Sequence, residues 1–293
     1  MAYEDPTSPA EAGLLAVERG LSELRAGRPV AVTGPEPALV APAEAVDAAL
    51  AARLGALAAG RARLVLPAPR LRRLGLDRAQ AGAVALPLID TARLESLALR
   101  VDARIDAPVG PVSEVDEEAL ELLSLALLLP AALVVPLDRE PPADLLRVPG
   151  AAVRAYRGAQ ARRIAIVSRA PVPLEGARDT EFVVFRGGEG LRDQVAIIVG
   201  RPDLSRPVAV RLHSACLTGD LFGSLKCDCG DQLRDTVRGM AAGEGGILLY
   251  LDQEGRGNGL ANKIRAYGLQ ARGFDTYEAD EVLGFGLDQR RFD

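Results

Sequence analysis

Hydrophobic and polar positions in the first half of the chain switch repeatedly between a helical and a strand-like period. Residues 10–27 place apolar side chains three and four positions apart, which predicts an amphipathic helix, and the short apolar run at 29–33 predicts a strand. The same succession recurs as a predicted helix at 43–59 and a predicted strand at 63–67. Helices and strands that alternate in this way predict an α/β domain.

A further helix is predicted at 113–129, because Ser113 can cap its first turn and acidic residues follow it. Acidic side chains in a first turn suit the positive end of the helix dipole. These acidic residues are Glu114, Asp116, Glu117 and Glu118. The uncharged, mostly apolar stretch at 122–137 is short for a membrane span and is interrupted by Pro130 and Pro136, so it predicts a buried helix followed by a strand.

A boundary between two domains is expected near residue 160. Residues 138–142 are charged and rich in proline, and 145–163 can be read as a linker or as a last helix of the first domain. Beyond this point strands dominate the pattern. The predicted strands are 164–168, 181–186, 194–199, 208–213 and 246–252, with helices at 231–242 and from about Leu260. We therefore expect an α/β (α+β) protein of two domains, 1–160 and 161–293, each a mixed sheet with packed helices.

Composition limits the class of protein. The chain has 293 residues, of which 48% are hydrophobic and 26% charged, which is enough to bury two cores. A formal charge of −5 argues against a general nucleic-acid surface, so any phosphate recognition must be local. The first six residues, Met-Ala-Tyr-Glu-Asp-Pro, lack the basic and apolar regions of a signal peptide. We expect a cytoplasmic protein that binds neither nucleic acid nor membrane.

The residues able to bind a soft metal are concentrated in one short segment. All three cysteines, Cys216, Cys227 and Cys229, and the single histidine, His213, fall within 213–229. The spacing C-x10-C-x-C offers three thiolates, a ligand set that favours zinc, and three protein ligands are typical of a catalytic zinc that keeps a water. A structural Cys3His site closed by His213 is the alternative. A disulfide is less favoured, since three cysteines leave one unpaired.

A second feature follows the predicted strand at 247–251. Gly255, Gly257 and Gly259 precede a helix that begins near Leu260, which is the geometry of a phosphate-binding turn at a helix N-terminus. By itself the signal is weak, because a dinucleotide-binding fingerprint would have a third glycine where Leu260 stands.

Several blocks of the second half, in order, resemble GTP cyclohydrolase II, the zinc enzyme that opens the imidazole ring of GTP at the start of riboflavin synthesis. The blocks begin at about Asp193 and include Arg-Leu-His-Ser-Ala-Cys-Leu-Thr-Gly-Asp from Arg211 and Leu-Tyr-Leu-Asp-Gln-Glu-Gly-Arg-Gly-Asn-Gly-Leu-Ala-Asn-Lys-Ile-Arg-Ala-Tyr at 249–267. They continue in Gly-Phe-Asp-Thr-Tyr-Glu-Ala-Asp at 273–280 and Leu-Gly-Phe-Gly-Leu-Asp-Gln-Arg-Arg-Phe at 283–292.

The resemblance implies a reaction in two parts. Zinc on the three cysteines leaves one position to water, whose pKa falls toward neutrality for attack at C8 of guanine. Ring opening and hydrolysis release formate and give 2,5-diamino-6-(5-phosphoribosylamino)pyrimidin-4(3H)-one. Pyrophosphate leaves from the triphosphate, which carries Mg²⁺; by resemblance Arg290 is the nucleophile and Asp288 the proton acceptor. Stabilising charge on the phosphoryl group is the competing role for Arg290.

Further residues match positions that bind or approach the substrate in the family. Tyr267 matches a tyrosine close to the ligand and is counted with the catalytic residues. The expected substrate-binding residues are Arg211, Leu212, His213, Ser214, Gln232, Glu254, Gly255, Arg256 and Thr276. Gln232 can instead be a solvated helix residue, Tyr267 a core aromatic, and Arg256 or Arg290 a surface charge. A homodimer is expected.

The first half faintly resembles 3,4-dihydroxy-2-butanone 4-phosphate synthase, at 17–32 and 100–104. That family carries an acidic metal-binding loop after its first strand and uses a histidine. The matching segment here, 33–42, has one carboxylate, Glu36, and this half has no histidine. We interpret it as a degenerate domain with a structural or dimerising role.

The second half departs from its family in two places. Ala215 stands where a glutamate usually precedes the first cysteine, and the family continues for several dozen residues beyond the position of Asp293. Two alternatives to a cyclohydrolase therefore stay open. One is a catalytically inactive, zinc-stabilised nucleotide-binding or regulatory homologue, and the other is a related hydrolase that acts on another purine or pyrimidine.

Overall fold

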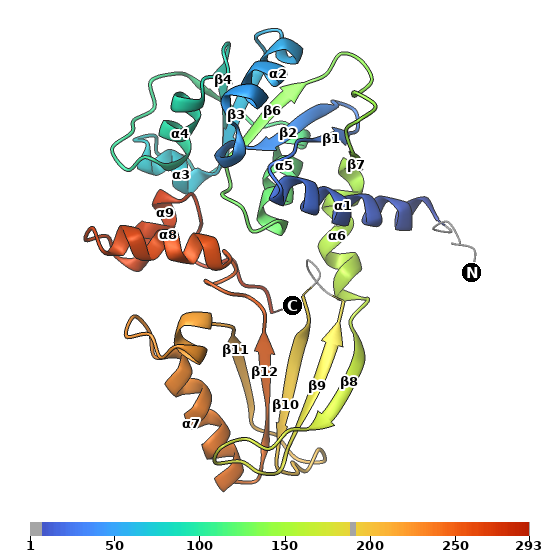
Figure 1. The fold of residues 1–293 in the computed structure, drawn as a ribbon, viewed down its shortest axis with the longest axis vertical. Helices are drawn as coiled ribbons and strands as arrows, with labels where there is room; N and C mark the ends of the chain where they lie inside the picture. Colours follow the sequence, from blue (N-terminus) through green and yellow to red (C-terminus); the bar gives the residue numbers. More distant parts are fainter. Residues whose placement is uncertain (1–7, 188–191, 293) are drawn as a thin grey trace. The chain divides into compact units, whose positions relative to one another are not determined.

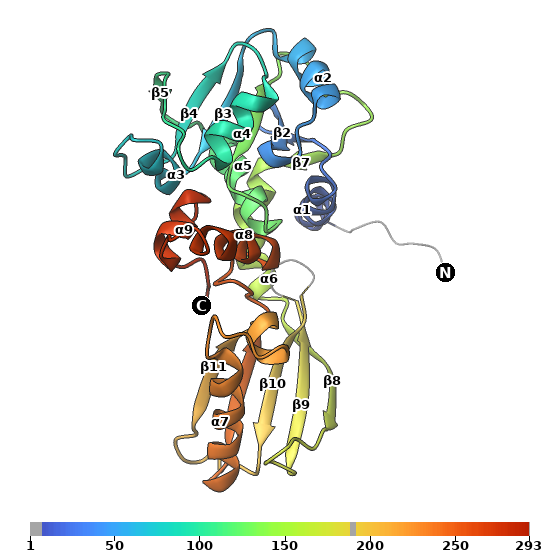
Figure 2. The same ribbon diagram turned by 60° about the vertical axis from the view of Figure 1, so that its left-hand side comes forward.

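The computed structural model describes residues 8–187 and 192–292, and the first six residues discussed above lie outside this range. The chain forms two compact units, each with its own sheet (Figures 1 and 2). The first comprises Met1–Tyr156 and Ala261–Gln289, and the second comprises Arg157–Leu260 and Arg290–Asp293. The expected fold class, two mixed sheets with packed helices, is confirmed.

The first unit is built on a seven-stranded sheet in the order β5-β4-β3-β6-β2-β1-β7. Its neighbours pair antiparallel, except that β1 and β7 run parallel. The strands are β1 (Val30–Thr33), β2 (Ala38–Pro42), β3 (Ala62–Leu66), β4 (Gly82–Leu86), β5 (Val109–Gly110), β6 (Ala132–Pro136) and β7 (Arg147–Pro149). Its helices are α1 (Pro9–Arg25), α2 (Ala48–Ala58), α3 (Ala68–Arg73), α4 (Thr91–Leu99), α5 (Glu114–Leu125) and α9 (Thr276–Val282), with α6 (Gly150–Ala161) and α8 (Leu260–Gln270) crossing the unit boundaries.

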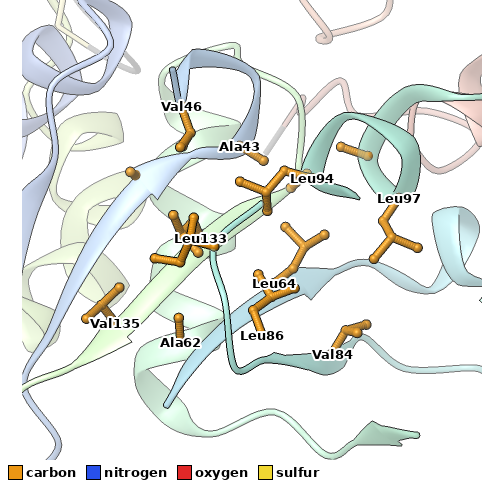
Figure 3. Packing of buried hydrophobic residues seen from close by; sticks show 14 of the residues in the cluster. Ala43, Val46, Ala62, Leu64, Val84, Leu86, Leu94, Leu97, Leu133 and Val135 are labelled. Atoms are coloured by element: carbon orange, nitrogen blue, oxygen red, sulfur yellow. The ribbon is translucent and has the colours of Figure 1, made fainter. Parts of the chain in front are cut away.

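One face of this sheet is covered by α2 and α4, whose apolar side chains pack with those of the strands. Figure 3 shows Leu94 and Leu97 of α4 beside side chains of the strands. Leu64 of β3, Leu94 of α4 and Leu133 of β6 are among the fully buried members. Because side chains alternate along a strand, Val65 and Val134 point to the opposite face, against which α5 packs. The core is therefore that of a sheet between two helical layers.

Local capping explains where several helices begin. Ser113 lies at the N-cap of α5, as the sequence predicted, and forms a capping box with Asp116. The helix expected at 43–59 begins later, because the Asp47 side chain caps α2 by accepting from Leu50 N at 2.8 Å. Before it, Ala43–Ala45 form a single 3-10 turn. The segment 145–163 contains both β7 and α6.

The second unit holds a five-stranded sheet in the order β11-β12-β10-β9-β8, with helix α7 (Cys229–Ala242) packed on one face. All pairs are antiparallel except β11 and β12, which are parallel and therefore need a crossover, here α7. The strands are β8 (Ala165–Pro171), β9 (Thr180–Arg186), β10 (Gln194–Val199), β11 (Val210–Ser214) and β12 (Gly246–Leu251). All three cysteines lie in the connection from β11 to α7 or at the first residue of that helix.

Among the described residues, no helix combines the length and the apolar character that a membrane crossing requires.

Candidate metal centre

The three cysteines come together at the start of the crossover. Cys216 follows β11 after one residue, Cys227 lies two residues before α7, and Cys229 is the first residue of that helix. Their Sγ atoms all lie within 4.8 Å of one another, and those of Cys216 and Cys227 are 3.5 Å apart. The N-terminal end of α7 carries a partial positive charge, which favours thiolates at this position.

Two glycines make the close approach of these segments possible. A Cβ atom on Gly219 would lie 2.8 Å from Cys227 Sγ and 3.0 Å from Cys216 Sγ. A Cβ on Gly230 would lie 2.3 Å from the carbonyl oxygen of Gly219. The turn at Leu217–Leu221, a short π-helix, can therefore wrap the sulfur atoms only with glycine at both positions.

The chemistry of the three thiols fits a soft divalent cation. Burial, together with hydrogen bonds and charges from the thiols of Cys216 and Cys227, raises the pKa of the Cys229 thiol to about 12. A metal that needs thiolate ligands removes this penalty, because its positive charge compensates the three negative ones. Three sulfur atoms this close together could bind one metal ion. His213 is not a member of the cysteine group.

His213 instead belongs to a buried network around Asp220, a residue that the sequence did not single out. Its Nε2 lies 3.2 Å from Asp220 Oδ1, and its ring stacks on Tyr250 with centroids 5.6 Å apart. Asp220 Oδ2 accepts from Cys216 N and from the Tyr250 hydroxyl, both at 2.9 Å. Burial and this hydrogen bond to Asp220 raise the pKa of Tyr250. One carboxylate therefore fixes the backbone of the first cysteine.

Arg211 and Gln232 lie together beside the cysteine segment. Arg211 Nη2 donates to Gln232 Oε1 at 2.6 Å, and Gln232 Nε2 donates to Asp228 Oδ2 at 2.7 Å. The Nε of Arg211 is buried and has no hydrogen-bond partner within the described chain. A buried donor without a partner is unusual and suits a site that awaits a polar ligand. Leu212, the next residue of β11, is instead about half exposed, at 47%.

The turn after β12 contacts the cysteine segment through Glu254. Its carboxylate accepts from Leu217 N at 2.6 Å and from Gly255 N at 2.9 Å. Gly255, Arg256 and Gly257 have φ values of 63°, 59° and 88°. The left-handed backbone of Arg256 is costly for a residue with a side chain, and such strain is common at functional sites.

Of the remaining expected residues, Ser214 and Arg290 lie close together in the second unit. Arg290 Nη1 is 3.5 Å from the Ser214 hydroxyl, and its guanidinium lies over the Phe292 ring at 5.6 Å. Tyr267, Thr276 and Asp288 belong to the first unit. There, Lys263 Nζ lies 5.7 Å from the centroid of the Tyr267 ring, and Gln270 Nε2 donates to the Thr276 hydroxyl at 3.3 Å. Asp288 is exposed.

The expected residues are thus divided between the units. The second unit holds the cysteines together with Arg211, Leu212, His213, Ser214, Gln232, Glu254, Gly255, Arg256 and Arg290. Asp220 and Tyr250 are site residues that the structure shows and the sequence did not predict. In the sequence, Asp220 is marked only by its place four residues after Cys216, in a loop that contains a glycine. No rule of spacing identifies the residues that Asp220 contacts.

Comparison with known proteins gives a family for this sequence. Residues 165–293 match the family model of GTP cyclohydrolase II. The GTP cyclohydrolase-2 of Xylella fastidiosa (strain Temecula1 / ATCC 700964) is 47% identical over 283 residues, which cover 94% of this chain and 71% of that protein. The GTP cyclohydrolase-2 of Azospirillum brasilense is 39% identical over 300 residues, covering 96% and 78%. That of Vibrio vulnificus (strain CMCP6) is 52% identical over 115 residues, covering 39% and 58%.

Solved structures give weaker likenesses. A two-domain 3,4-dihydroxy-2-butanone 4-phosphate synthase from A. baumannii covers 80% of this chain and 81% of its own, at 18% identity and a TM-score of 0.40. A 3,4-dihydroxy-2-butanone 4-phosphate synthase of Candida albicans covers 48% and 96%, at 16% identity and a TM-score of 0.39.

Proposed function

Because the chain belongs to the GTP cyclohydrolase II family, we propose that it is an enzyme that hydrolyses GTP, opening its imidazole ring with release of formate and pyrophosphate. The product is 2,5-diamino-6-(5-phosphoribosylamino)pyrimidin-4(3H)-one, and the step is the first of riboflavin biosynthesis. The observation that carries the proposal is the group of three cysteines, whose sulfur atoms lie within 4.8 Å of one another in the matched part of the chain. A cytoplasmic homodimer is part of the same proposal.

Zinc is the proposed resident metal, held by Cys216, Cys227 and Cys229. When bound, it supplies Lewis-acid activation of water for attack at C8 of the guanine. The chain's own residues shape the site. The Glu254 carboxylate accepts a hydrogen bond from the backbone N–H of Leu217, and the Asp220 carboxylate accepts one from the backbone N–H of Cys216. Both carboxylates thus fix the segment that presents the sulfur ligands.

Arg211 and Gln232 are proposed to bind the nucleotide. Their side chains are hydrogen-bonded to each other, so each restricts the rotamers of the other. The buried Nε–H group of Arg211 has no acceptor within the described chain, and a polar group of the substrate could accept its hydrogen bond. Part of the binding energy would then come from the hydrogen bond between Arg211 Nε and the substrate.

Arg290 is proposed to act at the triphosphate, which carries Mg²⁺. Water would attack the α-phosphorus as pyrophosphate leaves, and Asp288 would accept the proton of that water. A guanidinium is always protonated near neutral pH and has five N–H donors, so it stabilises developing charge on phosphoryl oxygens more readily than it attacks phosphorus. Ser214 Oγ, 3.5 Å from Arg290 Nη1, can orient the guanidinium. Charge stabilisation is the role that the chemistry of arginine favours.

The first half is proposed to be a degenerate, structural relative of the synthase. Glu36 lines a cavity of about 100 Å³ together with Glu114 and Glu118. Arg154 forms ion pairs with Glu114, at 2.8 Å, and with Glu118. An arginine thus compensates acidic groups that could otherwise hold a metal ion, which supports a structural role for this cluster.

Incubation of the protein with GTP, Zn²⁺ and Mg²⁺, followed by assays for formate and pyrophosphate, tests the proposed activity. Release of both supports a cyclohydrolase. Tight zinc and GTP binding without either product would identify an inactive binding homologue. Ala215 is the specific argument for it, since an alanine side chain has no oxygen with which to bind magnesium or a polar group of the substrate. Products from another purine or pyrimidine, with none from GTP, would identify a related hydrolase.

A further inference from the structure

Residues 261–289 pack against the sheet layers formed by the N-terminal part of the first unit. Leu269 of α8, Val282 of α9 and Phe285 form a buried apolar cluster with Leu129, which follows α5. Partly buried Leu99, at the end of α4, contacts the same cluster. This segment carries Tyr267, Thr276 and Asp288, three of the residues that the family resemblance assigns to GTP hydrolysis.

A buried arginine holds the end of α9. Arg70 of α3 is 1% exposed and is the largest fully buried side chain of the described residues. Its Nη1 donates to the carbonyl oxygen of Val282 at 2.8 Å. Its other donors reach carbonyl oxygens at the end of α4, with Nε to Leu97 at 2.7 Å and Nη2 to Arg100 at 2.8 Å and Ser96 at 3.1 Å.

These four contacts place one positive charge at the C-terminal ends of two helices, where the helix dipoles are negative. Burial and the nearby charge of Arg73 lower the pKa of Arg70 to about 10, which still leaves it protonated near neutral pH. A buried charge is costly unless its hydrogen bonds are satisfied. Three of the four bonds are made to the end of α4, and the fourth, to Val282, requires α9 to be in place, so Arg70 connects the two helices.

A partly buried carboxylate holds α8 in a similar way. Glu44 Oε2 accepts from Arg265 Nη2 at 2.5 Å, and its Oε1 accepts from Leu129 N at 3.0 Å. Asn262, which is 1% exposed, donates to the carbonyl oxygen of Leu127 at 3.1 Å and accepts from Arg265 Nη1 at 2.8 Å. Both helices of the segment are therefore joined to the N-terminal layers by buried or partly buried polar contacts as well as by the apolar cluster.

Resting on the proposed function, we infer that Arg70 and Glu44 are positioning residues for GTP hydrolysis. They hold α8 and α9 on the N-terminal layers and thereby fix Tyr267 and Thr276. A helix of seven residues such as α9 is not stable by itself in water, so its order depends on these contacts. The first half then contributes to the activity by supporting this segment, although it keeps no synthase chemistry of its own.

Arg70→Gln, made in the full chain, tests the inference. It removes the charge and most of the donors, and the carbonyl groups of both helices lose their partner. Each unsatisfied buried group costs roughly a factor of ten in a local equilibrium, so hydrogen exchange at the amides of Ala279 to Phe285 should accelerate by about 10². The KM for GTP should rise by about tenfold because Thr276 and Tyr267 lose their fixed positions. Arg70→Lys, which keeps a charge and three donors, should restore part of both values.

Two control variants separate positioning from general stability. Arg72→Gln removes an ion pair to α9, Arg72 Nη2 to Glu281 Oε1 at 2.9 Å, that is partly exposed and should matter little. Arg63→Gln breaks the ion pair with buried Asp116, at 2.7 Å, and lowers the stability of the same unit without touching residues 261–289. Neither control should change the KM for GTP.

The outcomes distinguish this inference from the proposed function. An unchanged KM in Arg70→Gln, or exchange at α9 no faster than in Arg63→Gln, overturns the positioning role while the parent protein still releases formate. If the parent releases no formate from GTP, the proposed function fails and the positioning role fails with it. In that case the exchange measurement still decides whether Arg70 holds α9 as a purely structural residue.

Discussion

Substitution of Asp220 tests whether its carboxylate positions the segment that carries the proposed metal ligands. The side chain is 9% exposed, and it accepts from Cys216 N and from the Tyr250 hydroxyl, both at 2.9 Å. In Asp220→Ala both donors lose their acceptor. At about 1–3 kcal/mol for each buried group left unsatisfied, the loss in free energy of unfolding should be about 2–6 kcal/mol. Asp220→Asn keeps the shape and one acceptor oxygen, and should lose about half as much, because neutral hydrogen bonds are roughly half as strong as charge-assisted ones.

The same substitution should weaken zinc binding. Groups that orient metal ligands typically contribute about 10- to 100-fold to metal affinity. Competition with a chromophoric chelator measures this affinity, and the ligand-to-metal absorption of the Co²⁺-substituted protein reports whether three sulfur ligands remain. Asp228→Asn is the matched control. It removes a negative charge between Cys227 and Cys229, but within the described part of the chain its exposed carboxylate accepts a side-chain hydrogen bond from Gln232 alone.

The order of effects decides the interpretation. Asp220→Ala should bind zinc more weakly than Asp220→Asn, which in turn should bind more weakly than the Asp228→Asn control. If Asp220→Ala holds zinc as tightly as the control and unfolds at the parent's denaturant concentration, the carboxylate does not organise the cysteine segment. The network around His213 and Tyr250 would then be packing alone.

Three further predictions follow from the site and its surroundings. Cys227→Ser should abolish stoichiometric zinc, measured by metal analysis, and lower the thermal unfolding temperature, because metal binding is coupled to folding. Arg290→Ala should slow pyrophosphate release by about 10² to 10³, measured in a coupled phosphate assay, and a parent-like rate would remove Arg290 from the phosphoryl step. The protein should form no product from ribulose 5-phosphate at any Mg²⁺ concentration, because Arg154 compensates the acidic cluster near Glu36; detectable product would contradict a degenerate first half.

Elements with strong local signals could be predicted from the sequence. The capping box of Ser113 marks the start of α5, and the apolar runs at 181–186 and 194–199 match β9 and β10. The strand β2 was missed because prolines flank it. It is defined by pairing with β1 and β6, contacts that no local pattern contains. The short helices α3 and α4 and the strands β4, β5 and β7 were missed as well.

Some residues of the candidate site could likewise be predicted from the sequence, and others could not. The cysteine spacing predicted a metal site, and the structure brings the three sulfur atoms within reach of one ion. This much could be predicted because ligand type and number are local properties of a sequence. Asp220 was not predicted, since its partners His213 and Tyr250 lie on two strands that meet only through the parallel pairing of β11 and β12. A role that depends on register across a sheet cannot be read from spacing along the chain.

The assignment of 1–160 and 161–293 to two domains stays a prediction, and contacts within the first unit bear on what such a division would cost. Arg70 reaches Val282 across 212 positions, and Glu44 reaches Arg265 across 221. A polypeptide cut at residue 160 would therefore leave the apolar side chains of α8 and α9 without Leu129 to cover them. Burial of apolar surface is the main favourable term in folding, so a segment that loses this cover also loses its order. Residues with a proposed role in GTP hydrolysis thus depend on a layer whose own sequence shows no such chemistry.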